Sequence, residues 1–219
     1  RPGMRRIWLP RLAALALILY FWASGITYLD RSPPVHEDEP WTAAPGYAFW
    51  ETGRFGTELF AGFYGMEQHY YAFPPLFSML VGAALHLFGM GLFQARVVPL
   101  ICIILTLALT YRLGTTLFSR WHGLVAVALL VGWRVAAPLS PLFSGIPLLD
   151  IAHIARYDAA VPLFGLAALC WFTVAVRNPS RWKWFGVGVL AGLALLSHLY
   201  GGFWLAPLLF ACVLRLRGR

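Results

Sequence analysis

The chain alternates long apolar runs with short polar segments. The apolar runs cover residues 12–29, 75–93, 97–118, 123–143, 159–176, 184–200 and 202–214. Runs of about 18 or more apolar residues are typical of helices that span a membrane. The alternation therefore predicts an all-α integral membrane protein, built as a polytopic helical bundle.

Composition and charge support this class of fold. Of the 219 residues, 60% are hydrophobic and only 12% are charged, and the mean hydropathy is +0.69. A soluble domain of this length does not need so few charges. The net charge of +8 comes from basic residues that separate the apolar runs, not from one basic surface, which argues against nucleic-acid binding. All three cysteines fall inside apolar runs, so no disulfide framework is expected.

The run at 75–93 decides the topology. If it spans the membrane, seven of the seventeen Lys and Arg residues face the cytoplasm; if it lies in the outer interface as a juxtamembrane helix, twelve do. Basic residues prefer the cytoplasmic side. The second arrangement gives about six transmembrane helices, a cytoplasmic N-terminus, a first outer loop with juxtamembrane helices at 30–95 and a second outer loop at 140–158. All nine acidic residues then lie on the outer side.

The first outer loop is rich in aromatic residues, as expected of segments at the level of the lipid headgroups. Pro40 and Pro45 limit any helix there to short pieces. Pro74 and Pro75 predict a sharp start for the helix that follows.

The stretch "PPVHEDEPWTAAPG", residues 33–46, places Glu37, Asp38 and Glu39 in a row beside His36. One interpretation is a polar loop that caps a short helix, since acids are favoured at a helix N-terminus. The other is a general base at the membrane surface, because removing a proton from an attacking hydroxyl needs a carboxylate or imidazole within hydrogen-bond reach. The residues alone leave both interpretations open.

A second polar cluster, "DIAHIARYDAA" at residues 150–160, holds Asp150, His153, Arg156 and Asp158 at a membrane boundary. In a purely structural interpretation, Asp158 caps the next helix and Arg156 extends its charge to the interface. In a functional one, Arg156 binds a phosphate and Asp158 orients it or shares a metal ion.

Two further segments are predicted to lie on the same, outer side of the membrane. "LSHLYGG" carries His198 at the end of an apolar run, and "HYYAFPPLF" carries Tyr70 and Tyr71. The histidine could simply be a satisfied interface residue, and the tyrosines an aromatic belt. Ionisable residues near the end of a span are nevertheless functional candidates. The convergence of the clusters on one membrane face favours an active site.

The residues that carry these clusters resemble a known superfamily. The segments are "EDEPWTAAPGYAFWETGRF", "AFPPLFSMLVGAALHLFGMGLFQARVVPL", "YRLGTTLF", "HIARYDAAVPLFGLAAL" and "GLALLSHLYGGFW". Their order and spacing resemble GT-C glycosyltransferases, in the branch of protein O-mannosyltransferases, the lipid A aminoarabinose transferase and the bacterial RgtA/B/C/D-like enzymes. Ala72 and Phe73 stand where aminoarabinose transferases carry an acidic–basic pair, which disfavours that activity.

The resemblance implies an inverting glycosyltransferase, which moves a sugar from a polyprenyl-phosphate donor to a hydroxyl of a glycan, lipid or protein acceptor. Asp38 matches the catalytic carboxylate, with Glu39 beside it. Arg156 and His198 are candidates for stabilising the leaving phosphate, and Asp158 for positioning them or the sugar.

His153 and Tyr71 complete the predicted substrate-binding set. No metal ligands are predicted and no cofactor is certain, although residues 37–39 and Asp158 could meet around a divalent cation. The resemblance also implies a multi-pass protein of the inner (plasma) membrane with its active site on the periplasmic or extracellular side. Residues 1–219 would then be the N-terminal part of a longer GT-C transmembrane module. The alternatives are a transporter or lipid flippase, whose charges line a path, and a non-catalytic membrane scaffold.

Overall fold

The computed structural model describes residues 2–135 and 144–217. All regular secondary structure in these residues is helical, which confirms the all-α prediction. The part of the run 123–143 after residue 135, and the first residues of the loop predicted at 140–158, lie outside the described ranges.

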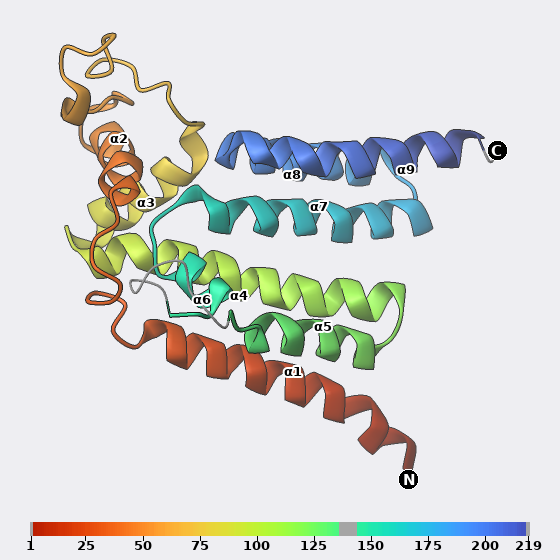
Figure 1. Cartoon of the computed structure of the whole chain (residues 1–219). Coiled ribbons are helices and arrows are strands. Elements are labelled where there is room, and N and C mark those ends of the chain that lie inside the picture. Colours follow the sequence, from red (N-terminus) through yellow and green to blue (C-terminus); the bar gives the residue numbers. More distant parts are fainter. Residues whose placement is uncertain (1, 136–143, 218–219) are drawn as a thin grey trace.

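Six helices run side by side and alternate in direction (Figure 1). They are α1 (Pro2–Ile26), α4 (Leu92–Leu117), α5 (Arg120–Gly132), α7 (Ala160–Arg177), α8 (Arg181–Ser197) and α9 (Leu205–Arg217). Both termini lie at one end of this bundle. Segments within α1 and α4, and residues 157–177, are long and apolar enough to cross a membrane. The other three helices are shorter, so the count of six spans stays a prediction.

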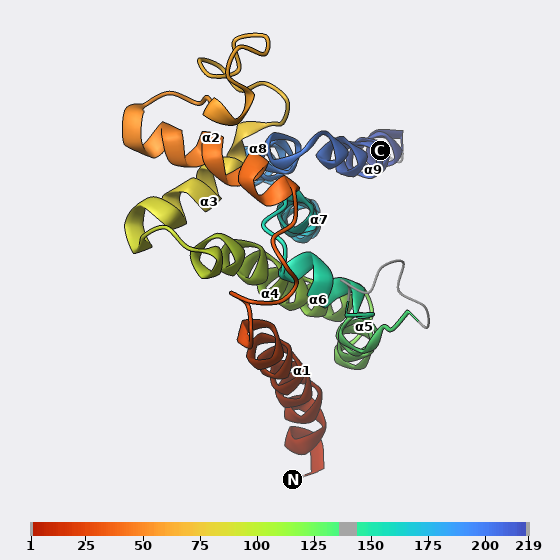
Figure 2. The same ribbon diagram turned by 60° about the vertical axis from the view of Figure 1, so that its left-hand side comes forward.

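Two helices lie across the opposite end of the bundle (Figure 2). These are α2 (Asp38–Thr52) and α3 (Pro75–Phe88), and they pack mainly on each other. α3, which lies in the run 75–93, is outside the bundle, and its juxtamembrane location stays a prediction. The next helix, α4, begins at Leu92, inside the predicted loop at 30–95.

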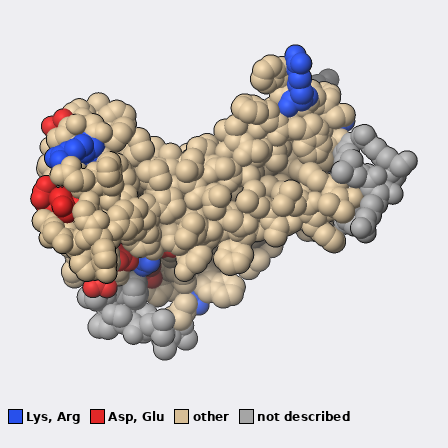
Figure 3. Space-filling model, turned by 90° about the horizontal axis from the view of Figure 1, so that it is seen from above, with Lys and Arg blue, Asp and Glu red and all other residues tan. Residues whose placement is uncertain are grey.

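Short helical segments complete this end of the molecule. They are η1 (Glu58–Phe60), α6 (Pro147–Ala152), η2 (Tyr157–Ala159) and η3 (Leu199–Trp204). In the face drawn in Figure 3, the acidic side chains gather at the end that carries α2 and α3. The acidic residues drawn in this view thus lie together at one end of the bundle.

The prediction that prolines divide the first outer loop into short helical pieces was wrong for α2, which continues for 15 residues. Pro40 lies in the first turn, where its missing N–H would have had no partner in the helix. Pro45 lies inside the helix and is fully buried. Its lost backbone hydrogen bond is therefore offset by packing.

The contact between α2 and α3 depends on two glycines. A Cβ built on Gly46 would lie 1.8 Å from the carbonyl oxygen of Ser78, and one built on Gly82 would lie 2.1 Å from the carbonyl carbon of Gly46. Trp50 Nε1 donates a hydrogen bond to the carbonyl of Met79 at 2.9 Å. The two backbones thus touch directly and form a rigid pair.

Replacing Gly46 with alanine is expected to destabilise the protein by about 1–3 kcal/mol, because the added methyl group would force α2 and α3 apart. Thermal unfolding in detergent measures this effect. The matched control is Gly192→Ala in α8, where an added Cβ meets nothing within 4 Å. That variant should keep or slightly raise the stability, since alanine favours helices, and equal behaviour of the two variants would contradict the argument.

Candidate functional site

The first turn of α2 directs two neighbouring carboxylates into the protein. Asp38 and Glu39 are the first two residues of the helix, where negative charge is favourable. Glu39 is only 3% exposed. Glu37, one residue earlier, is exposed. The three adjacent acids of the sequence therefore have different environments.

Glu39 forms a buried ion pair with Arg96, at the start of α4. Glu39 Oε1 accepts from Arg96 Nε, and Oε2 accepts from Nη2, both at 2.8 Å. The remaining donors of the fully buried guanidinium reach the carbonyls of Leu29, Pro33 and Pro34 at 2.9–3.2 Å. This bidentate pair therefore ties α2, α4 and the segment after α1 together.

Backbone donors complete the environment of Glu39. The carboxylate also accepts from the N–H groups of His36 and Ala155, at 2.8 and 3.0 Å. Burial would raise the pKa of Glu39, but the hydrogen bonds from Arg96 and these two N–H groups, together with the charge of Arg96, lower it overall. Glu39 is thus held as an anion next to Asp38 and next to the segment that leads into Arg156.

Asp38 lies beside the second polar cluster. Its Oδ2 is 3.0 Å from Nε of Arg156, and the same nitrogen is 3.2 Å from Oδ2 of Asp158. These contacts are ionic and do not have hydrogen-bond geometry, so within the described residues this nitrogen has no hydrogen-bond acceptor. About a quarter to a third of each of the three side chains is exposed. The cluster is therefore accessible to a ligand.

The guanidinium of Arg156 also lies over the ring of Tyr157, 5.6 Å from its centroid. Burial alone would lower the pKa of Arg156, but Asp158, the Tyr157 hydroxyl and Asp38 raise it above its ordinary value. Arg156 therefore stays a cation, and its planar fork suits a phosphate or carboxylate. Asp38 and Asp158, which the sequence left open as ligands of a divalent cation, share this arginine.

His198 belongs to an aromatic stack that adjoins the cluster. Its ring lies parallel to that of Tyr157 at a centroid distance of 4.0 Å, and Phe73 packs on both rings at 5.0–5.9 Å. Burial lowers the pKa of His198, and Arg156 lowers it further, against the opposing effect of Asp158. The imidazole is therefore neutral at neutral pH, and it is buried among these aromatic rings.

The other predicted site residues lie apart from this cluster. His153 is buried, with its ring nitrogens 3.0 and 2.7 Å from the carbonyls of Ser32 and Gly25, so it joins α6 to the end of α1. Tyr71 is 59% exposed, and its hydroxyl donates to the carbonyl of Tyr64. The polar atoms of both side chains are thus engaged by backbone carbonyls, and the contact of these two residues with substrate stays a prediction.

Sequence reasoning missed the roles of Arg96, Tyr157 and Phe73. Arg96 carried a usable signal, because an arginine near the start of an apolar run needs a partner. Phe73 and Tyr157 look like ordinary interfacial aromatics. Within the described residues, no three His, Cys, Asp or Glu side chains are close enough to hold a metal ion together.

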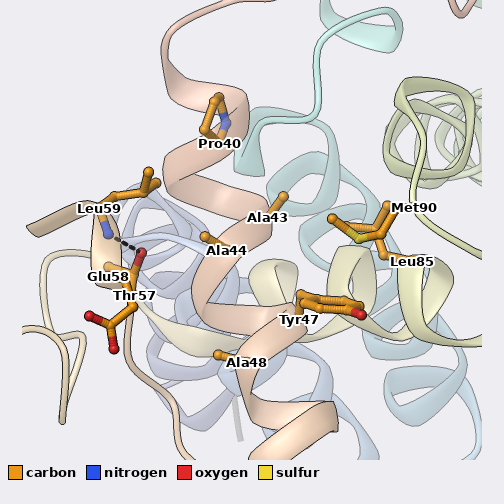
Figure 4. Close-up of a pocket in the computed structure, with 10 residues that line it drawn as sticks. All are labelled: Pro40, Ala43, Ala44, Tyr47, Ala48, Thr57, Glu58, Leu59, Leu85 and Met90. Carbon is orange, nitrogen blue, oxygen red and sulfur yellow. Dashed lines mark hydrogen bonds between the residues drawn. The ribbon is translucent and has the colours of Figure 1, made fainter.

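An apolar groove of about 490 Å³ follows α2 from Pro40, two residues after Asp38 (Figure 4). Tyr47 of α2 borders it together with Leu59 on one side of the helix and Met90 on the other. Few polar atoms line this groove. The charged cluster around Asp38, and not the groove, therefore has the means for chemistry.

Residues 72–219 match the family model of dolichyl-phosphate-mannose-protein mannosyltransferases. No curated protein and no solved structure matches the chain significantly. The matched range includes Arg156, Asp158 and His198 but begins after Asp38. Since the match covers more than half of the chain, the protein belongs to this family and is a membrane glycosyltransferase of the GT-C, mannosyltransferase-like type.

Proposed function

We propose that the protein transfers a sugar, with inversion, from a polyprenyl-phosphate donor to a hydroxyl of a cell-envelope glycan, lipid or protein. The observation that carries the proposal is the cluster of Asp38, Arg156 and Asp158, which joins a reachable carboxylate to a phosphate-binding group. The cluster lies at the end of the bundle that holds the acidic residues, which we assign to the outer face of the inner (plasma) membrane.

Asp38 acts as the general base in this reaction. It takes the proton of the acceptor hydroxyl as that oxygen attacks the anomeric carbon of the donor. The bond between this carbon and the phosphate oxygen breaks, and the polyprenyl phosphate leaves with the bonding electrons. Arg156 stabilises the charge that develops on the phosphate. Asp158, 3.2 Å from Arg156 Nε, holds the guanidinium in position.

Other residues position these groups. Glu39 contacts Arg96 and the N–H of Ala155, so it orients both Asp38 and the segment that carries Arg156. His198 stacks on Tyr157 and fixes this ring beside Arg156, where it can border the bound sugar. His153 holds the neighbouring segments together, and Tyr71 lies at the rim of the site.

The full-length protein in liposomes tests the donor class. Polyprenyl-phosphate mannose and nucleotide-linked mannose are supplied separately, with cell-envelope fractions as acceptors. We expect transfer from the lipid-linked donor alone, and a product with the anomeric configuration opposite to that of the donor. Transfer from the nucleotide sugar would refute the donor assignment, and retained configuration would refute inversion. The same assay can be repeated with other polyprenyl-phosphate sugars. Absence of transfer from all of them would favour a transporter or a non-catalytic scaffold.

Arg156→Lys should lower kcat/KM for the lipid-linked donor by about tenfold to hundredfold, because lysine keeps the charge but loses the planar fork. The control is Arg54→Lys, since Arg54 lies at the same end of the molecule and bonds to Gln68. Its transfer rate should equal that of the wild type. An Arg156→Lys variant with the wild-type rate would show that this arginine does not meet the phosphate.

A further inference from the structure

Tyr70 carries a polar atom that no part of the described structure uses. The side chain is 5% exposed, and its hydroxyl is buried without a hydrogen-bond partner in residues 2–135 and 144–217. A buried hydroxyl without a partner destabilises the folded protein, because it has lost its hydrogen bond to water. Buried polar groups are usually satisfied, so such an atom needs an explanation.

The ring of Tyr70 is fixed by other aromatic side chains. It stacks on Phe60 at a centroid distance of 6.4 Å, meets Phe55 edge-on at 6.0 Å and contacts Phe73 at 6.5 Å. Phe73 in turn packs on Tyr157 and His198. The hydroxyl is thus presented on a rigid support that is continuous with the aromatic stack of the site.

Neighbouring contacts connect Tyr70 to the candidate site. Its ring contacts Phe73, and Phe73 packs on Tyr157. Tyr157 lies under the guanidinium of Arg156, which contacts Asp38. Burial, and after it Tyr157 and Asp38, raise the pKa of Tyr70 to about 12, so the phenol remains a protonated donor at physiological pH. Tyr70 and Phe73 also line a pocket of about 360 Å³ with Leu199, so space for a ligand adjoins this ring.

We propose that Tyr70 is a substrate-binding residue whose O–H donates a hydrogen bond to a hydroxyl of the donor sugar bound beside Asp38. This inference rests on the proposed function and deepens it. The donor sugar supplies the acceptor atom that residues 2–135 and 144–217 do not provide, so binding relieves the cost of the buried hydroxyl. The contact also makes Tyr70 a specificity residue, because a site built to bond a sugar hydroxyl disfavours a sugar without it.

Tyr70→Phe separates this role from a structural one. The substitution removes the hydroxyl and keeps the ring and its packing. We expect the thermal stability to stay equal or to rise, because the protein loses an unsatisfied buried group. At the same time, kcat/KM for polyprenyl-phosphate mannose should fall about fivefold to fiftyfold. Affinity for a non-transferable phosphonate analogue of this donor, measured directly, should fall about as much.

Tyr111→Phe is the matched control, since the hydroxyl of Tyr111, in α4, is also buried without a hydrogen-bond partner in the described residues, but Tyr111 does not line this pocket. It should transfer sugar and bind the analogue like the wild type. Donor binding and transfer by Tyr70→Phe within twofold of the wild type would overturn the inference, as would a loss of activity that parallels a loss of stability. Binding of the analogue by the wild type without any transfer would count against the proposed function alone. Absence of both binding and transfer would overturn both.

Discussion

Full-length protein carrying Asp38→Asn is expected to transfer sugar about 100- to 10,000-fold more slowly than the wild type, which is the usual contribution of a general base. Asparagine keeps the size of the side chain but cannot accept the proton of the attacking hydroxyl. Since Asp38 is a partly exposed member of the cluster, and since Glu39 provides the buried ion pair, the fold should survive the substitution. Radiolabelled transfer in membranes with equal expression measures the effect.

Glu37→Gln is the control for this experiment. Glu37 is the adjacent acid, and it is exposed. It should leave the transfer rate unchanged, which would exclude a general effect of negative charge in this segment. If Asp38→Asn transferred sugar at the wild-type rate, Asp38 would not be the base, and Asp158, on the other side of Arg156, would become the candidate.

Arg96→Ala should destabilise the protein by about 3–5 kcal/mol, because it leaves the buried carboxylate of Glu39 without its counter-charge. Chemical unfolding in detergent micelles measures the loss. Arg54→Ala, which removes an exposed arginine at the same end of the molecule, should change the stability by less than about 0.5 kcal/mol. A small effect of Arg96→Ala would contradict the importance of the ion pair.

The double variant Glu39→Leu with Arg96→Met addresses the role of Glu39. An apolar pair of similar volume can replace a buried ion pair without loss of stability. If the double variant regains stability and sugar transfer, Glu39 is purely a positioning residue. If it regains stability but not transfer, the carboxylate of Glu39 itself is required for transfer, beyond its contribution to stability.

The lowered pKa of Glu39 adds a dependence on pH. A carboxyl group whose pKa falls on folding contributes stability above its unfolded pKa, and this contribution is lost as the pH falls through the folded value. The wild type should therefore lose stability on acidification, and the apolar double variant should lose less.

The lengths of the apolar runs were sufficient to predict the class of fold. Long apolar runs leave few alternatives to membrane helices, and the position of the acids between them limits where polar groups can meet. The partners within the site could not be predicted in the same way. Glu39 and Arg96 are 57 residues apart, and nothing local in either segment specifies the other.

Tertiary packing explains why the sequence did not predict the length of α2 or the burial of Tyr70. The length of α2 depends on the burial of Pro45 and on the direct approach of Gly46 to α3, and both are tertiary effects. Tyr70 and Tyr71 are neighbours of the same residue type, yet one is buried and the other is exposed. The two side chains point in different directions, so only Tyr70 is buried next to the candidate site. Residue type alone does not predict which of the two tyrosines is buried.

The ion pair between α2 and α4 also has a consequence for biosynthesis. The chain is made from its N-terminus, so α2 leaves the ribosome before Arg96 has been added. Until α4 enters the bilayer, Glu39 lacks its arginine, and the turn that carries Asp38 is not fastened to the bundle. A nascent chain arrested between these two helices therefore lacks the contact that orders the turn of Asp38. Under the proposed function, sugar transfer would begin only after insertion has passed α4.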